Sequence, residues 1–288
     1  MQNSDIKDPA FLKAVEAVDA GNLALLQQLV NANPGLVINR IDYPEEGYFK
    51  NPYLLWFIAD NPIRHEKLPS NIVAIASFLV DAVQHQTPET FQEQIDYTLG
   101  LVVTGRIPRE CGVQIQLMDV LIDAGAIPGQ GHGALAHGNL DAARHLIERG
   151  GELTLATAVC LDLRDDVELL LKNATMADRE VALVAAAFYG KADMIALLIK
   201  SGVNINACPG PSSGFHSHAT ALHHAVSAGS PDAVKILVDA GADLTARDRI
   251  YNGTPLGWAQ YALSENIDAP AKEKYKAIET FLQLKGKK

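Results

Sequence analysis

The sequence predicts an all-α fold, a solenoid of stacked helix pairs that forms one domain over residues 1–288. Two observations carry this prediction. The segment 220–248 holds two short amphipathic helix patterns, each followed by a glycine, and similar patterns recur along nearly the whole chain. In addition, 48% of the residues are hydrophobic and 20% are charged, which is an ordinary globular composition with enough apolar material for a core.

Segment 220–248 is the clearest unit. Thr220 stands where its hydroxyl can cap the first helix, and Gly229 and Gly241 stand where each helix should end in a left-handed residue. Apolar residues recur at three-to-four spacing in both halves: Leu222, Ala225 and Val226, then Val234, Leu237 and Val238. Such a helix pair has one apolar side that it cannot bury alone, so neighbouring units must stack on it.

This unit resembles the ankyrin repeat, whose pattern is T-P-L-H-x-A, then A-x-x-G, then V-x-L-L-L-x-x-G-A. The matching residues are Thr220, Leu222, His223, Ala225, Gly229, Val234, Leu237, Gly241 and Ala242. Ala221 departs from the pattern, which has proline there. The resemblance implies an ankyrin-type helix-pair solenoid that binds partner proteins through its finger loops and inner helices. It also implies that His223 hydrogen-bonds backbone between repeats.

About eight repeats are expected, the N-terminal ones divergent and similar to those of bacterial ankyrin-repeat proteins of unknown function. Their approximate bounds are 9–40, 51–85, 91–127, 128–152, 153–175, 178–207, 217–248 and 252–286. Insertions at Asn61–Asn71 and Gly105–Val113 separate the helices of two repeats, and Asp162 stands where glycine is usual. The first repeat and a last helix, 272–284, are expected to cap the array with a polar outer face.

The net charge of −10 argues against nucleic-acid binding and favours a protein partner of basic or mixed charge. No apolar run approaches the ~20 residues of a membrane helix, and the first residues carry no secretory pattern. The three cysteines, Cys111, Cys160 and Cys208, are far apart and suggest no disulfide framework. We therefore expect a cytoplasmic protein with no nucleic-acid or membrane partner.

The resemblance places one candidate binding surface in the C-terminal half. Phe188 and Tyr189 follow an inner-helix alanine run, where a purely structural repeat needs no aromatic residue. The other candidates on this side are His137, Phe215, His224, Tyr251, Trp258 and Tyr261. Two alternatives stay open: Phe188 or Tyr189 packs on the next inner helix, and Trp258 seals the core near the end of the array.

A second candidate surface is N-terminal. The aromatic segment 43–53 lies where a finger loop should be, and Trp56 follows it. The two insertions carry proline and arginine, and long loops in a compact array often serve binding. Their arginines could meet carboxylates of a partner. The candidate residues here are Tyr48, Phe49, Trp56, Asp60, Asn61, Arg64, Arg106 and Arg109.

The histidines raise the question of a metal site. His216, His218, His223 and His224 lie close in the sequence, with Cys208 nearby, and such side chains can bind zinc. However, no spaced Cys/His quartet accompanies them, and no nucleophile elbow, phosphate loop or H-E-x-x-H motif is present. We expect no metal, no cofactor and no catalysis. The alternative is an enzyme, or a receptor for a small ligand or metal, with a pocket built by the inserted loops.

Overall fold

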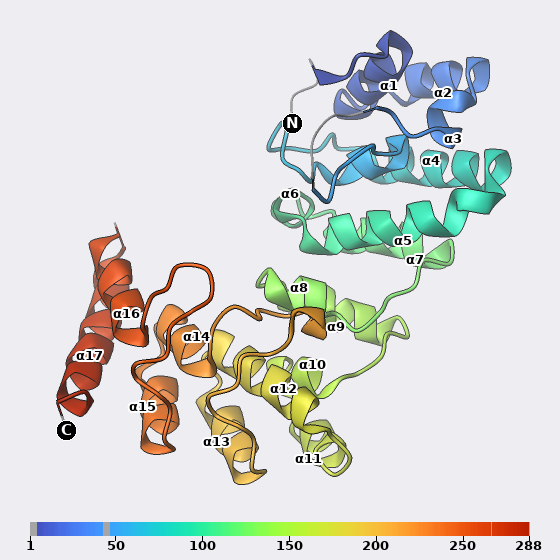
Figure 1. Ribbon diagram of the computed structural model, residues 1–288. Coiled ribbons are helices and arrows are strands. Elements are labelled where there is room, and N and C mark those ends of the chain that lie inside the picture. Colours follow the sequence, from blue (N-terminus) through green and yellow to red (C-terminus); the bar gives the residue numbers. More distant parts are fainter. Residues whose placement is uncertain (1–4, 43–46, 266, 288) are drawn as a thin grey trace. The chain divides into compact units, whose positions relative to one another are not determined.

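The computed structural model describes residues 5–42, 47–265 and 267–287 (Figure 1). Throughout these residues the regular structure is helical, without a β-strand, so the predicted all-α solenoid of helix pairs is confirmed. The chain divides into two compact units. The first is the described part of Met1–Gly129 together with Asp141–Gly151, and the second is Gln130–Leu140 together with the described part of Glu152–Lys288. The single domain and the repeat bounds given above stay a prediction.

The first unit has two rows of helices. Helix α1 packs on the 3₁₀ helix η2, which packs on α5, while α2, α4 and α7 form the second row. Its helices are α1 (Pro9–Asp19), α2 (Leu23–Ala32), α3 (Gly35–Ile38), η2 (Leu54–Ala59), α4 (Ile72–Gln86), α5 (Pro88–Thr104), α6 (Arg106–Glu110), α7 (Gln114–Asp123) and all but the first residue of α9 (Leu140–Glu148). All six residues of η2 are buried, so this short helix forms the centre of the core.

Inner and outer helices also alternate in the second unit. Helices α10, α12, α14 and α16 follow one another in the inner row, and α11, α13, α15 and α17 pair with them. The elements are α8 (His132–Ala136), α10 (Leu155–Cys160), α11 (Arg164–Leu170), α12 (Met176–Phe188), α13 (Ala192–Lys200), η3 (Pro211–Ser213), α14 (Ala221–Ser227), α15 (Pro231–Asp239), α16 (Pro255–Ser264) and α17 (Ala269–Lys285). The run 182–187 in α12 is fully buried, and its four alanines let neighbouring helices approach closely.

Turn chemistry in the second unit follows the sequence pattern. Gly229 and Gly241 have φ of +58° and +97°, which is the left-handed conformation expected after α14 and α15. Asp162 has φ of +58° at the equivalent point after α10, so a residue with a side chain occupies a glycine position. That conformation is unfavourable for a residue with a Cβ, although aspartate tolerates it better than most.

The Thr220 hydroxyl behaves differently from the prediction. Thr220 is the N-cap residue of α14, but its side chain makes no capping hydrogen bond. Instead the hydroxyl pairs with Nδ1 of His223 at 2.8 Å, while Nε2 of His223 lies 3.1 Å from the carbonyl oxygen of Gly253. His223 thus bonds backbone of the following repeat, as the resemblance implies.

One of the two insertions predicted from the sequence contains a short helix. Within Gly105–Val113, residues Arg106–Glu110 form helix α6. None of the helices in the described part of the chain is both long and apolar enough to cross a membrane.

Candidate protein-binding surface

A long finger loop, residues 208–218 between α13 and α14, folds onto the inner helices of the second unit. Phe215 and His216 from this loop contact Phe188 at the end of α12, with ring centroids 5.7 Å and 4.5 Å apart. His216 also lies 5.3 Å from His224 of α14. Phe215 is 5% exposed and His224 is 3% exposed. The expectation that Phe215 and His224 face a partner is therefore corrected, because the long finger turns inward and covers them.

The imidazoles of this cluster are held neutral. Burial, followed by the nearby His216, His218 and His223, lowers the pKa of His224 to about 3. Burial and His218 likewise lower the pKa of His216. The Nε2 atoms of His216 and His224 are buried without a hydrogen-bond partner among the described residues. Within the same residues, no three His, Cys, Asp or Glu side chains are placed to hold a metal ion.

Phe188 and Tyr189 are half-buried and make contacts within the second unit. The Tyr189 hydroxyl donates to the carbonyl oxygen of Leu135 at 2.7 Å, which ties α12 to α8. Phe188 packs edge-on against Tyr189 with centroids 5.1 Å apart, in addition to its contacts with the finger. The alternative that Phe188 or Tyr189 packs on the next inner helix describes Phe188, whose ring centroid lies 6.1 Å from that of His224 in α14, whereas Tyr189 bonds α8 instead. His137, also predicted, is exposed at the end of α8.

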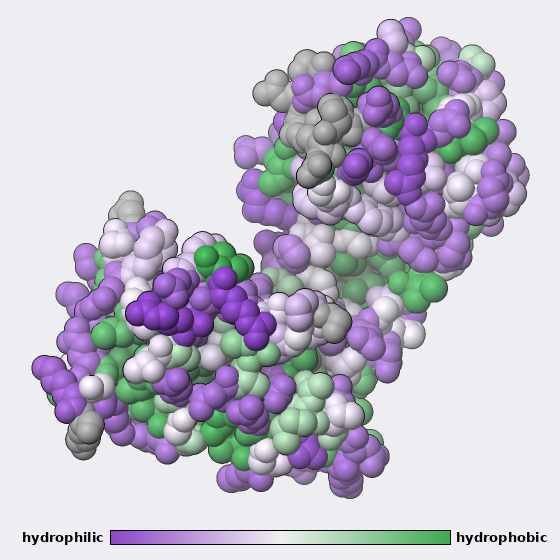
Figure 2. Space-filling view, in the orientation of Figure 1, coloured by the Kyte–Doolittle hydropathy of each residue, from purple (hydrophilic) through white to green (hydrophobic). Residues whose placement is uncertain are grey.

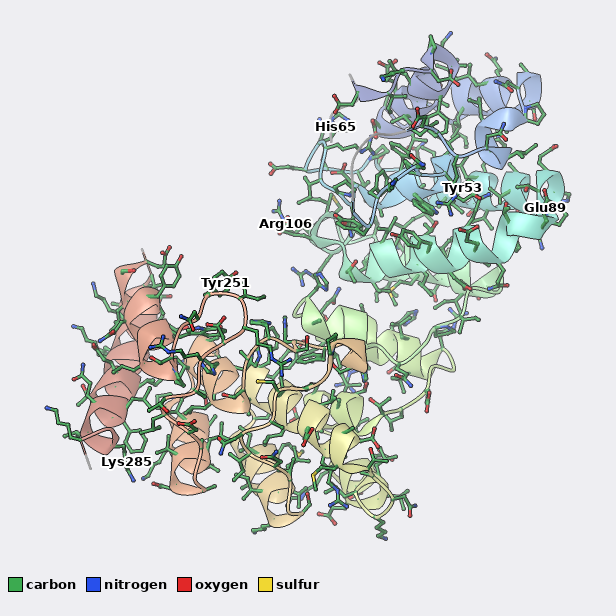
Figure 3. All side chains as sticks on the ribbon, viewed as in Figure 1. Tyr53, His65, Glu89, Arg106, Tyr251 and Lys285 are labelled. Carbon is green, nitrogen blue, oxygen red and sulfur yellow. The ribbon has the colours of Figure 1, made fainter. Side chains whose placement is uncertain are left out.

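The remaining aromatic candidates of this unit gather at a pocket. Tyr251 is 75% exposed on the loop between α15 and α16, where Figure 3 labels it, and Tyr261 is 68% exposed on α16. Both side chains line a pocket of about 760 Å³ together with half-buried Trp258. We call this pocket the aromatic pocket. Its other lining residues are Ser227, Gly253, Gly257, Ala262, Glu265, Ile267 and Tyr275.

Asp248 organises the loop that carries Tyr251. One carboxylate oxygen accepts the backbone N–H groups of Ile250 and Tyr251 at 2.9 and 2.6 Å, and the other accepts Gly253 N–H and the indole Nε1 of Trp258 at 2.8 and 3.0 Å. Burial alone would raise the pKa of Asp248, but the hydrogen bonds outweigh it and lower the pKa to about 2. The carboxylate is therefore ionised at neutral pH and fixes both Tyr251 and Trp258.

Tyr275 and Glu265 are among the lining residues of this pocket that were not predicted from the sequence. Tyr275 precedes Ile278 and Leu282 by three and seven residues, so it shares the buried face of α17. Its hydroxyl donates to the carbonyl oxygen of Ser227 at 2.7 Å. The helical spacing was a usable signal for Tyr275. For Glu265, which follows α16, the sequence held no signal.

In the first unit most aromatic candidates lie in the core. Phe49 and Trp56 are 5% and 2% exposed, and the Trp56 ring stacks on Tyr97 with centroids 4.0 Å apart. Their predicted contact with a partner is corrected, because the chain folds them into the apolar interior around η2. Tyr48 is 57% exposed, and its hydroxyl donates to Oδ1 of Asn61 at 3.0 Å. Tyr43, from the same predicted finger, lies outside the described residues.

The insertion 61–71 is held by a buried ion pair. The Arg64 side chain is 2% exposed, and its guanidinium bonds Asp19 at 2.9 Å, lies 3.5 Å from Asp60 and stacks on the Phe57 ring. Asp60 also accepts the backbone N–H groups of residues 64, 65 and 66. The expectation that Arg64 and Asp60 meet a partner is corrected, since these charges neutralise each other inside the unit.

The other polar candidates are more accessible. Asn61 is half-buried and donates to the carbonyl oxygen of Leu101 at 2.9 Å. Arg106, which Figure 3 shows at α6, pairs with Glu110 at 3.0 Å and is about half exposed. Arg109 on the same helix is also exposed. The structure therefore keeps Tyr48, Arg106 and Arg109 at the surface of the first unit.

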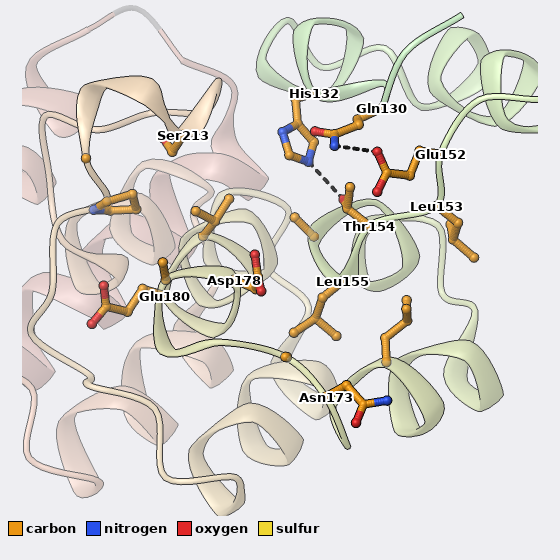
Figure 4. A pocket seen from close by; sticks show the side chains of 17 residues that line it. Gln130, His132, Glu152, Leu153, Thr154, Leu155, Asn173, Asp178, Glu180 and Ser213 are labelled. Atoms are coloured by element: carbon orange, nitrogen blue, oxygen red, sulfur yellow. Dashed lines mark hydrogen bonds between the residues drawn. The ribbon is translucent and has the colours of Figure 1, made fainter.

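A second pocket in the C-terminal unit, of about 580 Å³, is more polar (Figure 4). Its lining includes the carboxylates of Glu152, Asp178 and Glu180. His132 bonds Thr154 at 2.9 Å on its wall, and burial lowers the pKa of this imidazole. Cys160, at the end of α10, is not among the lining residues of this pocket and is fully buried, which raises the pKa of its thiol to about 12. A thiol with this pKa stays protonated at neutral pH and is a poor nucleophile.

Comparison with known proteins gives one family match. The family model "Ankyrin repeats (3 copies)" matches residues 131–248. Residues of the chain are 41% identical over 81 positions to mouse ankyrin repeat and SOCS box protein 6, covering 27% of this chain and 18% of that protein. They are 35% identical over 115 positions to rice zinc finger CCCH domain-containing protein 50, covering 38% of this chain and 16% of that protein. The matches thus span less than a fifth of either relative.

One similar solved structure is the human ASB11 ankyrin repeat domain. The alignment covers 97% of this chain and 98% of that domain, with 16% identity and a TM-score of 0.35.

Proposed function

Because the chain is an ankyrin-repeat protein, with matched repeats over residues 131–248, we propose that it is a non-catalytic module that binds another protein. Ankyrin repeats are generally protein–protein interaction modules. The observation that carries the proposal is the aromatic pocket, where Tyr251 and Tyr261 are 75% and 68% exposed beside Trp258. Tyrosine and tryptophan side chains that line a pocket are typical of binding hot spots.

The physical reason is the form of these side chains. A tyrosine buries a large ring on binding while it loses the freedom of only two torsion angles. Its hydroxyl gives the ring one polar end that can hydrogen-bond a partner or water. In Figure 2 hydrophilic and hydrophobic residues are interspersed on the visible face of the second unit, which contains the aromatic pocket. Such a mixed surface, in which polar and apolar residues lie side by side, suits a protein partner.

The proposal includes the charge and the setting of the partner. The net charge of −10 favours a partner with a basic or mixed surface and disfavours nucleic acid. The three cysteines are free thiols, which supports a reducing compartment such as the cytoplasm. The exposed residues Tyr48, Arg106 and Arg109 form part of the proposal as a second contact area on the first unit.

The alternative is an enzyme or a small-ligand receptor, and it would use the polar pocket in Figure 4. That pocket is not built by the insertions 61–71 and 105–113, which belong to the first unit. The aromatic pocket is lined mainly by ring and aliphatic groups, which match protein side chains better than a reacting centre. These features support binding over catalysis.

The experiment is affinity capture from native lysate with the full chain as bait. We expect one or more proteins to be retained by the wild type and lost with a Tyr251→Ala, Tyr261→Ala double variant. The matched control is Leu169→Ala, which truncates a 58% exposed side chain of α11 that does not line the aromatic pocket. Circular dichroism must show that all baits are folded. A partner retained equally by all three baits would refute the aromatic pocket as the binding site.

A further inference from the structure

We propose that the aromatic pocket binds a cationic side chain, lysine or arginine, from a segment of the partner protein. This proposal rests on the proposed function and names the chemistry of its partner. Four rings line the pocket, those of Tyr251, Trp258, Tyr261 and Tyr275. The faces of tyrosine and tryptophan rings carry negative electrostatic potential and attract cations within about 6 Å of the centroid.

The hydrogen-bonding edges of three rings are already used. The indole N–H of Trp258 donates to Asp248 at 3.0 Å, and the Tyr275 hydroxyl donates to the Ser227 carbonyl at 2.7 Å. The Tyr261 hydroxyl shares a hydrogen bond with the carboxylate of Glu265. The rings therefore offer a ligand mainly their carbon surface, which favours a cation or an apolar group over a neutral polar group.

The negative charges near the rings favour a cation over an apolar group as the occupant of the pocket. Glu265 is exposed and lines the pocket, and the ionised carboxylate of Asp248 bonds the edge of the Trp258 ring. A carboxylate that accepts the indole N–H makes the ring more electron-rich and its face more attractive to a cation. Glu265 provides in addition a direct opposite charge. This charge complementarity selects a lysine or arginine side chain as the occupant.

The size of the pocket fits a segment rather than an isolated ion. A volume of about 760 Å³ lies within the ~300–1,000 Å³ of pockets that enclose drug-sized ligands. The long aliphatic stem of lysine or arginine can pack on the apolar lining formed by Ala262 and Ile267, while the charged end reaches the rings and Glu265.

The test uses the two tryptophans of the chain. Trp258 lines the pocket, whereas Trp56 is buried in the first unit, so its indole signal is an internal reference. The full chain, labelled with ¹⁵N-indole tryptophan, is titrated with short glycine–serine peptides that hold one central arginine, lysine, norleucine or glutamate. A Trp56→Phe variant assigns the two signals.

We expect the Trp258 signal to shift with the arginine and lysine peptides and the Trp56 signal to stay in place. Affinity for the cationic peptides should exceed that for the norleucine peptide by about 5- to 30-fold. Glu265→Gln should reduce this preference, and Tyr261→Ala should weaken binding of the cationic peptides, while Leu169→Ala, at an exposed position of α11 outside the pocket, should change neither. Both pocket positions are exposed, so these variants should fold.

The proposal is overturned if Trp258 does not respond to the cationic peptides up to about 10 mM, or if norleucine binds equally well. It is also overturned if Glu265→Gln leaves the preference intact. If these peptides fail while capture of the partner still depends on Tyr251 and Tyr261, only the cation proposal fails. If that capture fails as well, the proposed function fails with it.

Discussion

Acidification should destabilise the second unit through His224. The folded-state pKa of His224 is about 3, against an ordinary value of 6.5. Above pH 6.5 the imidazole is neutral in both states and has no effect on stability. Below pH 6.5 the imidazole takes up a proton in the unfolded chain but stays neutral in the folded state. The free energy of unfolding therefore decreases as the pH is lowered from 6.5 to about 3. Each pH unit in this window costs about 1.4 kcal/mol for one such group.

The loss between pH 7 and pH 5 is therefore about 2 kcal/mol from His224 alone. The titratable groups that face it are His216 and His218 from the finger and His223 from its own helix, and all three lower the pKa of His224. The lowered pKa values of His216 and His223 act in the same direction. The negative charge of Asp248 partly offsets the effect of burial on His223, so the pKa of His223 is lowered less than burial alone would lower it.

The perturbation is His224→Phe, which keeps an aromatic ring beside Phe188 and Trp258 and removes the titrating group. We expect a variant whose free energy of unfolding falls by about 2 kcal/mol less than that of the wild type between pH 7 and pH 5. The assay is urea unfolding at both pH values, followed by fluorescence of Trp258 in a Trp56→Phe background. His85→Gln is the control, because His85 is exposed on α4. Equal pH dependence of wild type and His224→Phe would refute the reasoning.

Three further substitutions test other parts of the structure, each by urea unfolding at pH 7. Asp248→Ala removes the acceptor of four hydrogen bonds and should lower the free energy of unfolding by about 2–4 kcal/mol; a loss below 1 kcal/mol would contradict the role given to this carboxylate. Arg64→Ala leaves two carboxylates without their buried partner and should cost about 3–5 kcal/mol, and an unchanged midpoint would show that these charges are solvated. Asp162→Gly relieves the left-handed backbone and should stabilise by about 0.5–1 kcal/mol, reduced by loss of the surface ion pair with Lys191; a clear destabilisation would rule out backbone strain at this position.

The repeat pattern predicted the helices of segment 220–248 well because helix formation there depends on residues close together in the sequence. The apolar spacing and the terminal glycines of segment 220–248 depend only on neighbouring residues, and α14 and α15 lie where this pattern places them. The role of His223 also follows from position within the repeat. These features are the same in any repeat with this pattern, so no knowledge of distant contacts was needed.

The candidate surface was predicted less well because exposure depends on distant segments. The alanine run before Phe188 shows where α12 ends, but not that a finger about 27 residues later folds over its ring. Likewise, Arg64 is recognisable as a charge, but its partner Asp19 is 45 residues away. Tyr251 lies on a loop and Tyr261 on α16, and both side chains are exposed, whereas their contact with a partner stays a prediction.

The placement of the long loops has a consequence for how this chain can change during evolution. The regular backbone hydrogen bonds of an α-helix join residues of the same helix. A longer loop between two helices therefore leaves the hydrogen bonding of both helices unchanged. Segments 61–71 and 208–218 both lengthen the chain at such junctions, while the helices that flank them keep their packing partners. Loop length and loop sequence can therefore diversify between related proteins while the helical scaffold stays unaltered, and new surfaces can arise at these junctions without rebuilding the core.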